Sequence, residues 1–417
     1  MSLAAQAPSR PAARPTPRAP EAGRPQWGVL TVGVVALLAL VVAAWTTQGW
    51  PQAALLALGA GLGFTLFHAR FGFTSAWRQL VSVGQGRGLR AHSLLLALTT
   101  VLFAPVLAMG LAPVAGSVSG NVAPVGVSLV VGAFVFAVGM QIGGACASGT
   151  LYAVGSGQTS ILLTLGGFVV GATVGAAHLG WWARTPNIGA VSLADVFGSY
   201  TAGVVVTLVV LALIVAVTIV VERRRTPPPI GPVPTARGLA RVLRGSWPLW
   251  VGAAALAVLN LGVLLVSGSP WGVTTAFALW GSKAAGALGI ADPSTWTFWS
   301  GDRADVLAGS VLAESTSLTD LGIIVGAMVA SALAGAFTLH QRVPARLALG
   351  AVIGGLLMGY GARLAYGCNI GAYLGGISSL SLHGWVWGAV ALVGTVLGVR
   401  LRPLFGLSRP QSSDSVC

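Results

Sequence analysis

Charged residues are scarce in this sequence. Only 8% of its 417 residues are Asp, Glu, Lys or Arg, whereas 55% are hydrophobic. Soluble domains carry about a quarter charged residues, so this composition excludes an ordinary soluble protein. Several uninterrupted apolar runs are long enough, or nearly so, to cross a bilayer: 29–44, 94–112, 125–138, 201–221 and 323–339. Because these runs are continuous and do not alternate, they predict membrane helices and not an outer-membrane barrel.

Cysteine is also rare. The chain has three: Cys146 and Cys368 lie inside apolar segments, and Cys417 is the last residue. Three cysteines make no disulfide framework, and none belongs to a C-x-x-C redox motif. Cys146 and Cys368 have no His or acid nearby in the sequence, which argues against a zinc or copper site. We therefore predict no metal and no cofactor.

Acidic residues number nine and lysine occurs once, at Lys283, yet the net charge is +14. The arginines lie at the ends of apolar segments, whereas acids from Asp292 to Asp320 gather around one long polar loop, 286–318. This is the positive-inside pattern of a membrane protein, with basic loops in the cytoplasm and the acidic loop outside. It predicts a multi-pass protein of the cell inner or plasma membrane with both termini cytoplasmic, in contact with lipid and not with nucleic acid.

The predicted fold is all-α and polytopic, with about ten transmembrane helices and four re-entrant half-helices in two inverted repeats. The spans are expected at 28–47, 51–68, 92–110, 126–143, 159–179, 199–221, 248–266, 320–340, 346–363 and 383–400. Four stretches are too short or too rich in glycine to cross, and we expect half-helices there: 70–83, 144–157, 268–285 and 367–381.

The expected organisation has five parts. A disordered Arg- and Pro-rich tail at 1–27 precedes a first membrane half at 28–221, and a basic cytoplasmic linker at 222–247 precedes a second half at 248–400. A second cytoplasmic tail covers 401–417.

Matching motifs interrupt the two halves. Cys146 and Cys368 lie 222 residues apart, and the same offset relates Gly132 to Gly354 and Gly139 to Gly361. A second offset of 200 relates the motif F-G-F-T-S-A-W at 71–77 to W-G-V-T-T-A-F at 271–277. Counting spans gives the repeats, roughly 51–180 and 248–400, opposite orientations in the membrane. Corresponding broken segments in two halves point to a transporter's substrate site.

The two cysteines are the first candidates for chemistry. A lone buried cysteine is more often a small hydrophobic residue, but a pair in matching glycine-flanked breaks favours function. A neutral thiol donates weakly to a soft, polarisable substrate. For an anionic substrate the thiol has to stay protonated, because a thiolate would repel it. Half-helix N-termini, with free N–H groups and partial positive charge, also suit an anion.

Polar residues near the cysteines form the second group of candidates. Ser148 and Asn369 offer neutral donors along an anion path, or alternatively bond back to helix carbonyls. Gln141, one turn before Cys146, needs a partner if it is buried. Arg363 lies within the apolar stretch before Cys368 and is expected to attract an anion near the outer mouth, although snorkelling to the interface is the alternative. For Lys283 function and snorkelling are equally open.

The segment G-M-Q-I-G-G-A-C-A-S-G-T-L-Y at 139–152 resembles the first signature of the YeeE/YedE family of sulfur-compound transporters, and G-Y-G-A-R-L-A-Y-G-C-N-I-G at 359–371 resembles the second. The resemblance extends over roughly 50–400. It implies uptake of thiosulfate or a related sulfur anion, with Cys146 and Cys368 contacting the substrate by S–H···S hydrogen bonds. Shorter family members have a further cysteine in the first half-helix, where this chain has Thr74, which would weaken or redirect such a relay.

The resemblance further implies a small cytoplasmic sulfur-carrier protein as a partner. Contact of Cys417 with this partner is one alternative, and an incidental role for Cys417 is the favoured one. The prediction is a permease, not an enzyme, for a small sulfur-containing anion. Two alternatives remain from the residues: a membrane thiol protein that accepts sulfane sulfur as a persulfide, and a channel or scaffold without sulfur specificity. A selenium or other sulfur species is the alternative substrate.

Overall fold

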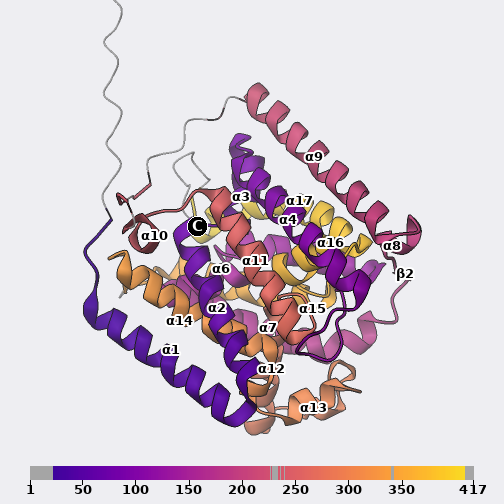
Figure 1. The fold of residues 1–417 in the computed structure, drawn as a ribbon, viewed down its shortest axis with the longest axis horizontal. Coiled ribbons are helices and arrows are strands. Elements are labelled where there is room, and N and C mark those ends of the chain that lie inside the picture. Colours follow the sequence, from indigo (N-terminus) through magenta and orange to yellow (C-terminus); the bar gives the residue numbers. More distant parts are fainter. Residues whose placement is uncertain are drawn as a thin grey trace, which may run out of the picture.

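The computed structural model describes residues 22–225, 227, 233–234, 236–238, 240–339 and 342–408. Most of the first predicted tail, part of the basic linker, and residues 409–417 of the second tail with Cys417 lie outside the described residues. Figure 1 shows a closely packed bundle of helices with almost no strand. The only strands in the described part, β1 (Pro124–Gly126) and β2 (Asn187–Ala190), pair antiparallel. The predicted all-α fold is confirmed.

Ten helical segments among the described residues have the length and hydropathy to cross a membrane, at the ten predicted places. Their principal helices are α1 (Trp27–Gln48), α2 (Trp50–Ala69), α4 (Arg87–Met109), α5 (Val127–Ile142), α7 (Thr159–Trp182), α9 (Tyr200–Arg225), α11 (Leu249–Ser267), α14 (Ser315–Leu333), α15 (Ala345–Leu364) and α17 (Leu382–Leu401).

Shorter helices begin at each predicted break. They are α3 (Phe73–Val83), α6 (Ala147–Gly155), α12 (Thr274–Ala287) and a π-helical turn, η4 (Asn369–Leu374), that continues into α16 (Gly375–Ser378). At 1.5 Å per residue none of them alone reaches across a hydrocarbon core of about 30 Å. The remaining short helices are α8 (Leu193–Val196), α10 (Ala240–Arg244), α13 (Arg303–Ala308) and single 3₁₀ turns.

The helix packing has an internal two-fold pattern. Helix α2 packs on α14 as α11 packs on α4, and α7 packs on α15 as α17 packs on α5. The short helices follow the same rule, since α3 contacts α17 and α12 contacts α7. In each case a helix of the first repeat packs on a helix of the second, and the counterparts of these two helices pack on each other as well. This is the arrangement expected of two related halves.

Glycines show that the two halves are related by inversion. On α5 and α15, a Cβ at Gly132 would lie 2.7 Å from the carbonyl oxygen of Gly361, and a Cβ at Gly139 would lie 2.7 Å from that of Gly354. By the repeat offset, Gly132 corresponds to Gly354 and Gly139 to Gly361. Gly132 therefore contacts the counterpart of Gly139, and Gly139 contacts the counterpart of Gly132. This crossed contact shows that α5 and α15 are antiparallel, as two helices related by a two-fold axis perpendicular to them would be. Only glycine permits so close an approach.

Helices α1 and α9 lie outside the repeats, as their sequence positions predict. Figure 1 shows them at two edges of the bundle. Only 11% and 17% of the residues in their apolar windows are buried within the protein. Because their exposed faces are apolar, these two helices offer surface to lipid.

The acidic loop ends earlier than the sequence analysis predicts. Helix α14 begins at Ser315, because the Glu314 carboxylate accepts hydrogen bonds from the backbone N–H groups of Thr316 and Ser317 at 2.9 and 2.6 Å and caps the helix. Asp320, assigned above to the loop and to the first position of the span, therefore lies inside the helix and is fully buried. The polar residues of the first turn conceal this start in the sequence.

Candidate functional site

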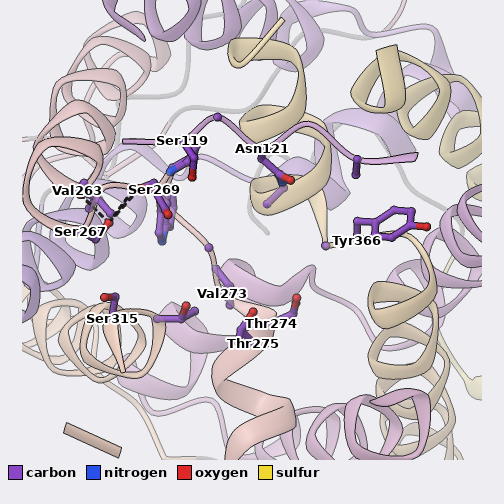
Figure 2. Close-up of a pocket in the computed structure, with 18 of the residues that line it drawn as sticks. Ser119, Asn121, Val263, Ser267, Ser269, Val273, Thr274, Thr275, Ser315 and Tyr366 are labelled. Carbon is purple, nitrogen blue, oxygen red and sulfur yellow. Dashed lines mark hydrogen bonds between the residues drawn. The ribbon is translucent and has the colours of Figure 1, made fainter. Parts of the chain in front are cut away.

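A cavity of about 630 Å³ opens beside Arg363, and we call it the Arg363 cavity. Its wall comes from the loop before β1, the segment that leads into α12, the first turn of α14 and the end of α15. Figure 2 shows the polar groups of Asn121, Thr274, Thr275 and Ser315 around this space, with Tyr366 at one side. Neutral hydroxyl and amide groups thus share this cavity with two arginines, Arg303 and Arg363, and one acid, Glu314.

Arg363 is the buried cation of this cavity. Its side chain is only 7% exposed, and one guanidinium nitrogen donates a hydrogen bond to the Thr274 hydroxyl. The guanidinium carbon lies 5.2 Å from the centre of the Phe298 ring, a cation–π contact that Arg303 also makes at 4.7 Å. The Arg363 Nε atom has no hydrogen-bond partner among the described residues. A buried, charged donor therefore remains free at the cavity.

A smaller cavity of about 240 Å³ lies beside Arg87, and we call it the Arg87 cavity. Gly72, Ser75 and Gln79 line it at the start of α3, as Gly272 and Thr275 line the Arg363 cavity at the start of α12. The two cavities lie at opposite ends of α11, whose 19 residues span about 27 Å.

Leu249 at the beginning of α11 lines the Arg87 cavity, and Ser267 at its end lines the Arg363 cavity. Ala69 at the end of α2 also lines the Arg87 cavity. Helices α2 and α11 therefore run in opposite directions, as inverted repeats require.

Equivalent polar pairs stand near each cavity. The Gln141 amide nitrogen lies 3.5 Å from the backbone oxygen of Thr74. With the offsets of 222 and 200, these two residues correspond to Arg363 and Thr274, whose side chains also bond to each other. The Thr74–Gln141 pair is buried and does not line the Arg87 cavity. The Arg363–Thr274 pair is therefore accessible from its cavity, whereas the equivalent neutral pair, Thr74–Gln141, is closed off from the Arg87 cavity.

The thiols lie at the starts of the second pair of breaks. Cys146 precedes α6 and Cys368 precedes the π-helical turn, and they are 2% and 1% exposed. The Cys146 sulfur lies 3.7 Å from the Ser148 hydroxyl, and the Cys368 sulfur accepts the backbone N–H of Ile370 at 3.4 Å. Both belong to one hydrophobic cluster and are within electrostatic range of each other. The structure therefore brings the two predicted cysteines into one region.

Backbone conformation before the two cysteines is also equivalent. Gly144 has a φ of +88° and Tyr366, its counterpart 222 residues later, has a φ of +58°. The left-handed region costs little for glycine but is an outlier for an aromatic residue. Tyr366 lines the Arg363 cavity, so the strained position lies at the candidate site, where such strain tends to collect.

Several buried polar groups at or beside the paired breaks have no hydrogen-bond partner among the described residues. Among the described residues, no hydrogen-bond partner exists for the Thr74 hydroxyl, the Gln141 amide oxygen, or either amide atom of Asn369. A buried polar group left unpaired costs about 1–3 kcal/mol. Unpaired groups in a native structure call for a reason, and a role in binding a polar substrate is one.

Two further residues have structural contacts. The Lys283 ammonium donates to the carbonyl oxygens of Leu307 and Gly309, both at 2.7 Å, and so ties the long loop to α12. Arg402, which the sequence analysis does not single out, donates to the Gln141 backbone oxygen at 2.7 Å and holds that end of α5. Its position at the end of the last span gives no sequence signal for this contact. Among the described residues no group of His, Cys, Asp and Glu is arranged to hold a metal ion.

Inverted repeats, paired broken helices and a cavity at each end of the bundle together define a membrane protein built like a secondary transporter. A sequence model of the sulphur transport family matches residues 68–397. The chain belongs to this family.

Two relatives cover most of the chain. The thiosulfate transporter TsuA of Spirochaeta thermophila is 28% identical over 338 residues, which are 79% of this chain and 93% of that protein. TsuA of Escherichia coli is 26% identical over 368 residues, 85% of this chain and 95% of that protein. The probable transporter YedE of Escherichia coli is 30% identical over 167 residues, 38% of this chain, and the chain spans 41% of its length.

Proposed function

We propose that this protein is an inner-membrane permease that takes up a small sulfur-containing anion, with thiosulfate as the substrate. Membership of the sulphur transport family and the similarity to two proteins named thiosulfate transporters support this proposal. The alternative substrate within the same function is a selenium or other sulfur species.

The observation that carries the proposal is a set of buried polar groups, at or beside the paired breaks, that have no hydrogen-bond partner among the described residues. Arg363, Thr74, Gln141 and Asn369 each bury a side-chain nitrogen or oxygen without a partner. Two buried thiols lie in the same interior. Three of these groups are donors without a partner among the described residues, and each can donate a hydrogen bond to an anion: Arg363 Nε, the Thr74 hydroxyl and the Asn369 amide nitrogen.

In the proposed path Arg363 receives the anion first. Its free Nε and the neutral donors of the Arg363 cavity attract negative charge, while the acid of the cavity, Glu314, accepts hydrogen bonds from the first turn of α14. Cys146 and Cys368 then offer S–H groups in a dry, apolar setting. Sulfate lacks the soft sulfur that rewards a thiol contact, so the thiols favour thiosulfate. Gln141, the neutral counterpart of Arg363, binds the anion less tightly and lets it leave.

The proposed orientation follows from the charges at the two cavities. Arg70 and Arg87 line the Arg87 cavity, so the positive-inside rule places that cavity in the cytoplasm. The Arg363 cavity then faces outside, and both termini are cytoplasmic. A cytoplasmic sulfur-carrier protein is the proposed recipient of the anion.

Uptake of radiolabelled thiosulfate by proteoliposomes tests the function. We expect Cys146→Ser and Cys368→Ser to abolish uptake, because a hydroxyl is a harder and more strongly hydrated donor than a thiol. Cys417→Ser is the matched control and should transport like the wild type. Excess unlabelled sulfate should not compete. Normal uptake by both membrane-segment variants would refute the thiol path, as would equal competition by sulfate.

Acceptance of sulfane sulfur as a persulfide is the second candidate function, favoured by the proximity of the two buried thiols. Mass spectrometry of the purified protein after exposure to thiosulfate separates the two functions. A permease leaves Cys146 and Cys368 unmodified. In a sulfur acceptor the thiolate of one cysteine attacks the outer sulfur of thiosulfate, the S–S bond breaks, and the cysteine gains one sulfur atom while sulfite is released.

A further inference from the structure

Asp320 is a carboxylic acid inside a membrane-spanning helix. Its side chain is fully buried in α14, and neither carboxyl oxygen has a hydrogen-bond partner among the described residues. An ionised carboxylate in such a place is costly unless it is paired. Acids at membrane depth are rare, and those that occur frequently relay protons or bind ions.

Asp320 adjoins residues of α14 that line the Arg363 cavity. Thr316, Asp320 and Ile324 are spaced by four residues and share one face of α14. Thr316 and Thr319 line the Arg363 cavity, and the Ile324 carbonyl lies against Gly155 at the end of α6. Asp320 is also within electrostatic range of Cys368.

None of the cations on the neighbouring elements is placed to neutralise Asp320. Helix α14 packs against α1, α2, α6, α10, α12 and the turn η3 (Val311–Ala313). On α12 the Lys283 ammonium is bonded to two loop carbonyls. Arg241 and Arg244 of α10 bond to Ser246 and Gly23, on the side where α14 ends.

The other titratable groups facing α14 are neutral or acidic. Helix α2 contributes His68, whose ring is bonded to the Gly245 carbonyl at the far end. Helix α6 contributes Tyr152 and the Cys146 thiol at its start, and α1 contributes no titratable side chain. Glu314, at the start of α14, is within electrostatic range of both Asp320 and Arg363. Among the described residues of the elements packed on α14, no positive side chain is therefore placed to pair with an ionised Asp320.

We propose that Asp320 binds the proton that is carried together with the anion. This inference rests on the proposed function. An ionised Asp320 would repel an anion approaching Cys368, whereas the neutral acid would not. Proton binding and anion binding therefore favour each other, and by linkage the effect is mutual. The proton passes from water in the Arg363 cavity to a carboxyl oxygen of Asp320, and returns to water when the Arg87 side opens. No other bond is made or broken.

Proteoliposomes containing the full chain test this coupling, with radiolabelled thiosulfate as the probe and the membrane potential held at zero by valinomycin and potassium. Exchange of labelled for unlabelled thiosulfate at equal pH measures passage of the anion alone. Accumulation under a pH difference, acid outside, measures coupling. With one proton per anion, a difference of one pH unit drives about tenfold accumulation.

We expect wild type to exchange and to accumulate, and Asp320→Asn to exchange without accumulating, because the amide cannot release a proton. Asp320→Glu should retain some accumulation. Asp305→Asn, which changes an exposed loop acid, is the matched control and should behave like wild type. The affinity of wild type for thiosulfate should fall as the pH rises, and that of Asp320→Asn should not change.

Two results would overturn the inference while leaving the proposed function intact. They are accumulation by Asp320→Asn equal to wild type, and accumulation driven by a sodium gradient in place of the pH gradient. Loss of exchange in folded, monodisperse Asp320→Asn and Asp320→Glu alike would also overturn it, because the acid would then serve anion passage itself. Absence of exchange in wild type would refute thiosulfate permeation and, with it, the coupling.

Discussion

Arg363→Gln is the sharpest substitution that the repeat suggests, because it gives the second half the residue that the first half has at Gln141. The change removes the positive charge at the Arg363 cavity and keeps a donor of hydrogen bonds. A hydrogen bond to a charged group contributes about 1.5–3 kcal/mol. Since 1.4 kcal/mol corresponds to a tenfold change, we expect the KM for thiosulfate uptake to rise by about one to two orders of magnitude.

Arg303→Gln is the matched control for this experiment. Both guanidinium groups lie over the Phe298 ring and line the same cavity, but Arg303 is exposed, whereas Arg363 is only 7% exposed. Exposed charge pairs contribute about 0.2–1 kcal/mol, so the KM of this control should rise by less than about fivefold. Added salt should remove the effect of Arg303→Gln and leave much of the effect of Arg363→Gln, because buried charges are screened less.

Uptake kinetics at low and high ionic strength, with both variants checked for folding by size-exclusion chromatography, give the answer. Equal KM values for wild type and Arg363→Gln would refute the role of the buried charge. Equal effects of the two substitutions would show that the general field of the cavity, and not the burial of Arg363, attracts the anion.

Two other substitutions test the packing and the selectivity. Gly139→Ala places a Cβ 2.7 Å from the Gly354 oxygen and should destabilise the protein by about 1–3 kcal/mol, seen as a lower Tm in detergent. The control Gly166→Ala, whose Cβ meets nothing within 4 Å, should not lower the Tm. Equal losses of Tm in the two variants would contradict the crossed contact. Thr74→Cys adds a weak S–H donor beside Gln141, worth about 0.5–1 kcal/mol, and should raise the preference for thiosulfate over sulfate by about two- to fivefold. An equal rise of this preference in Thr74→Ser would exclude the thiol as its cause.

Much of the candidate site is visible in the sequence because the repeat is. The offset of 222 singles out Cys146 and Cys368 from the three cysteines, and the structure places these two in one buried cluster. The same offset aligns Gln141 with Arg363. The sequence does not indicate, however, that Gln141 contacts Thr74 and that Arg363 contacts the equivalent Thr274. That pairing depends on how the short helices fold back between the spans.

Asp320 shows what a hydropathy profile misses. The residues before it, Ser315 to Thr319, are mostly polar and read as the end of a loop. The helix nevertheless starts at Ser315, because Glu314 caps it. The signal that could have placed this start is an acid followed by small polar residues and then by an apolar run, which is typical of a helix N-terminus.

The sequence by itself determined the membrane class, the ten spans, the two inverted repeats and the family, because apolar length and repeated glycine–cysteine motifs are properties of the chain in one dimension. Only the tertiary structure decided that the Arg363 side is open while the Thr74–Gln141 side is closed, and that Asp320 is buried without a cation. Those features depend on which side chains from distant segments meet in the interior, and burial of a polar group is defined by its neighbours in space and not by its neighbours in the chain.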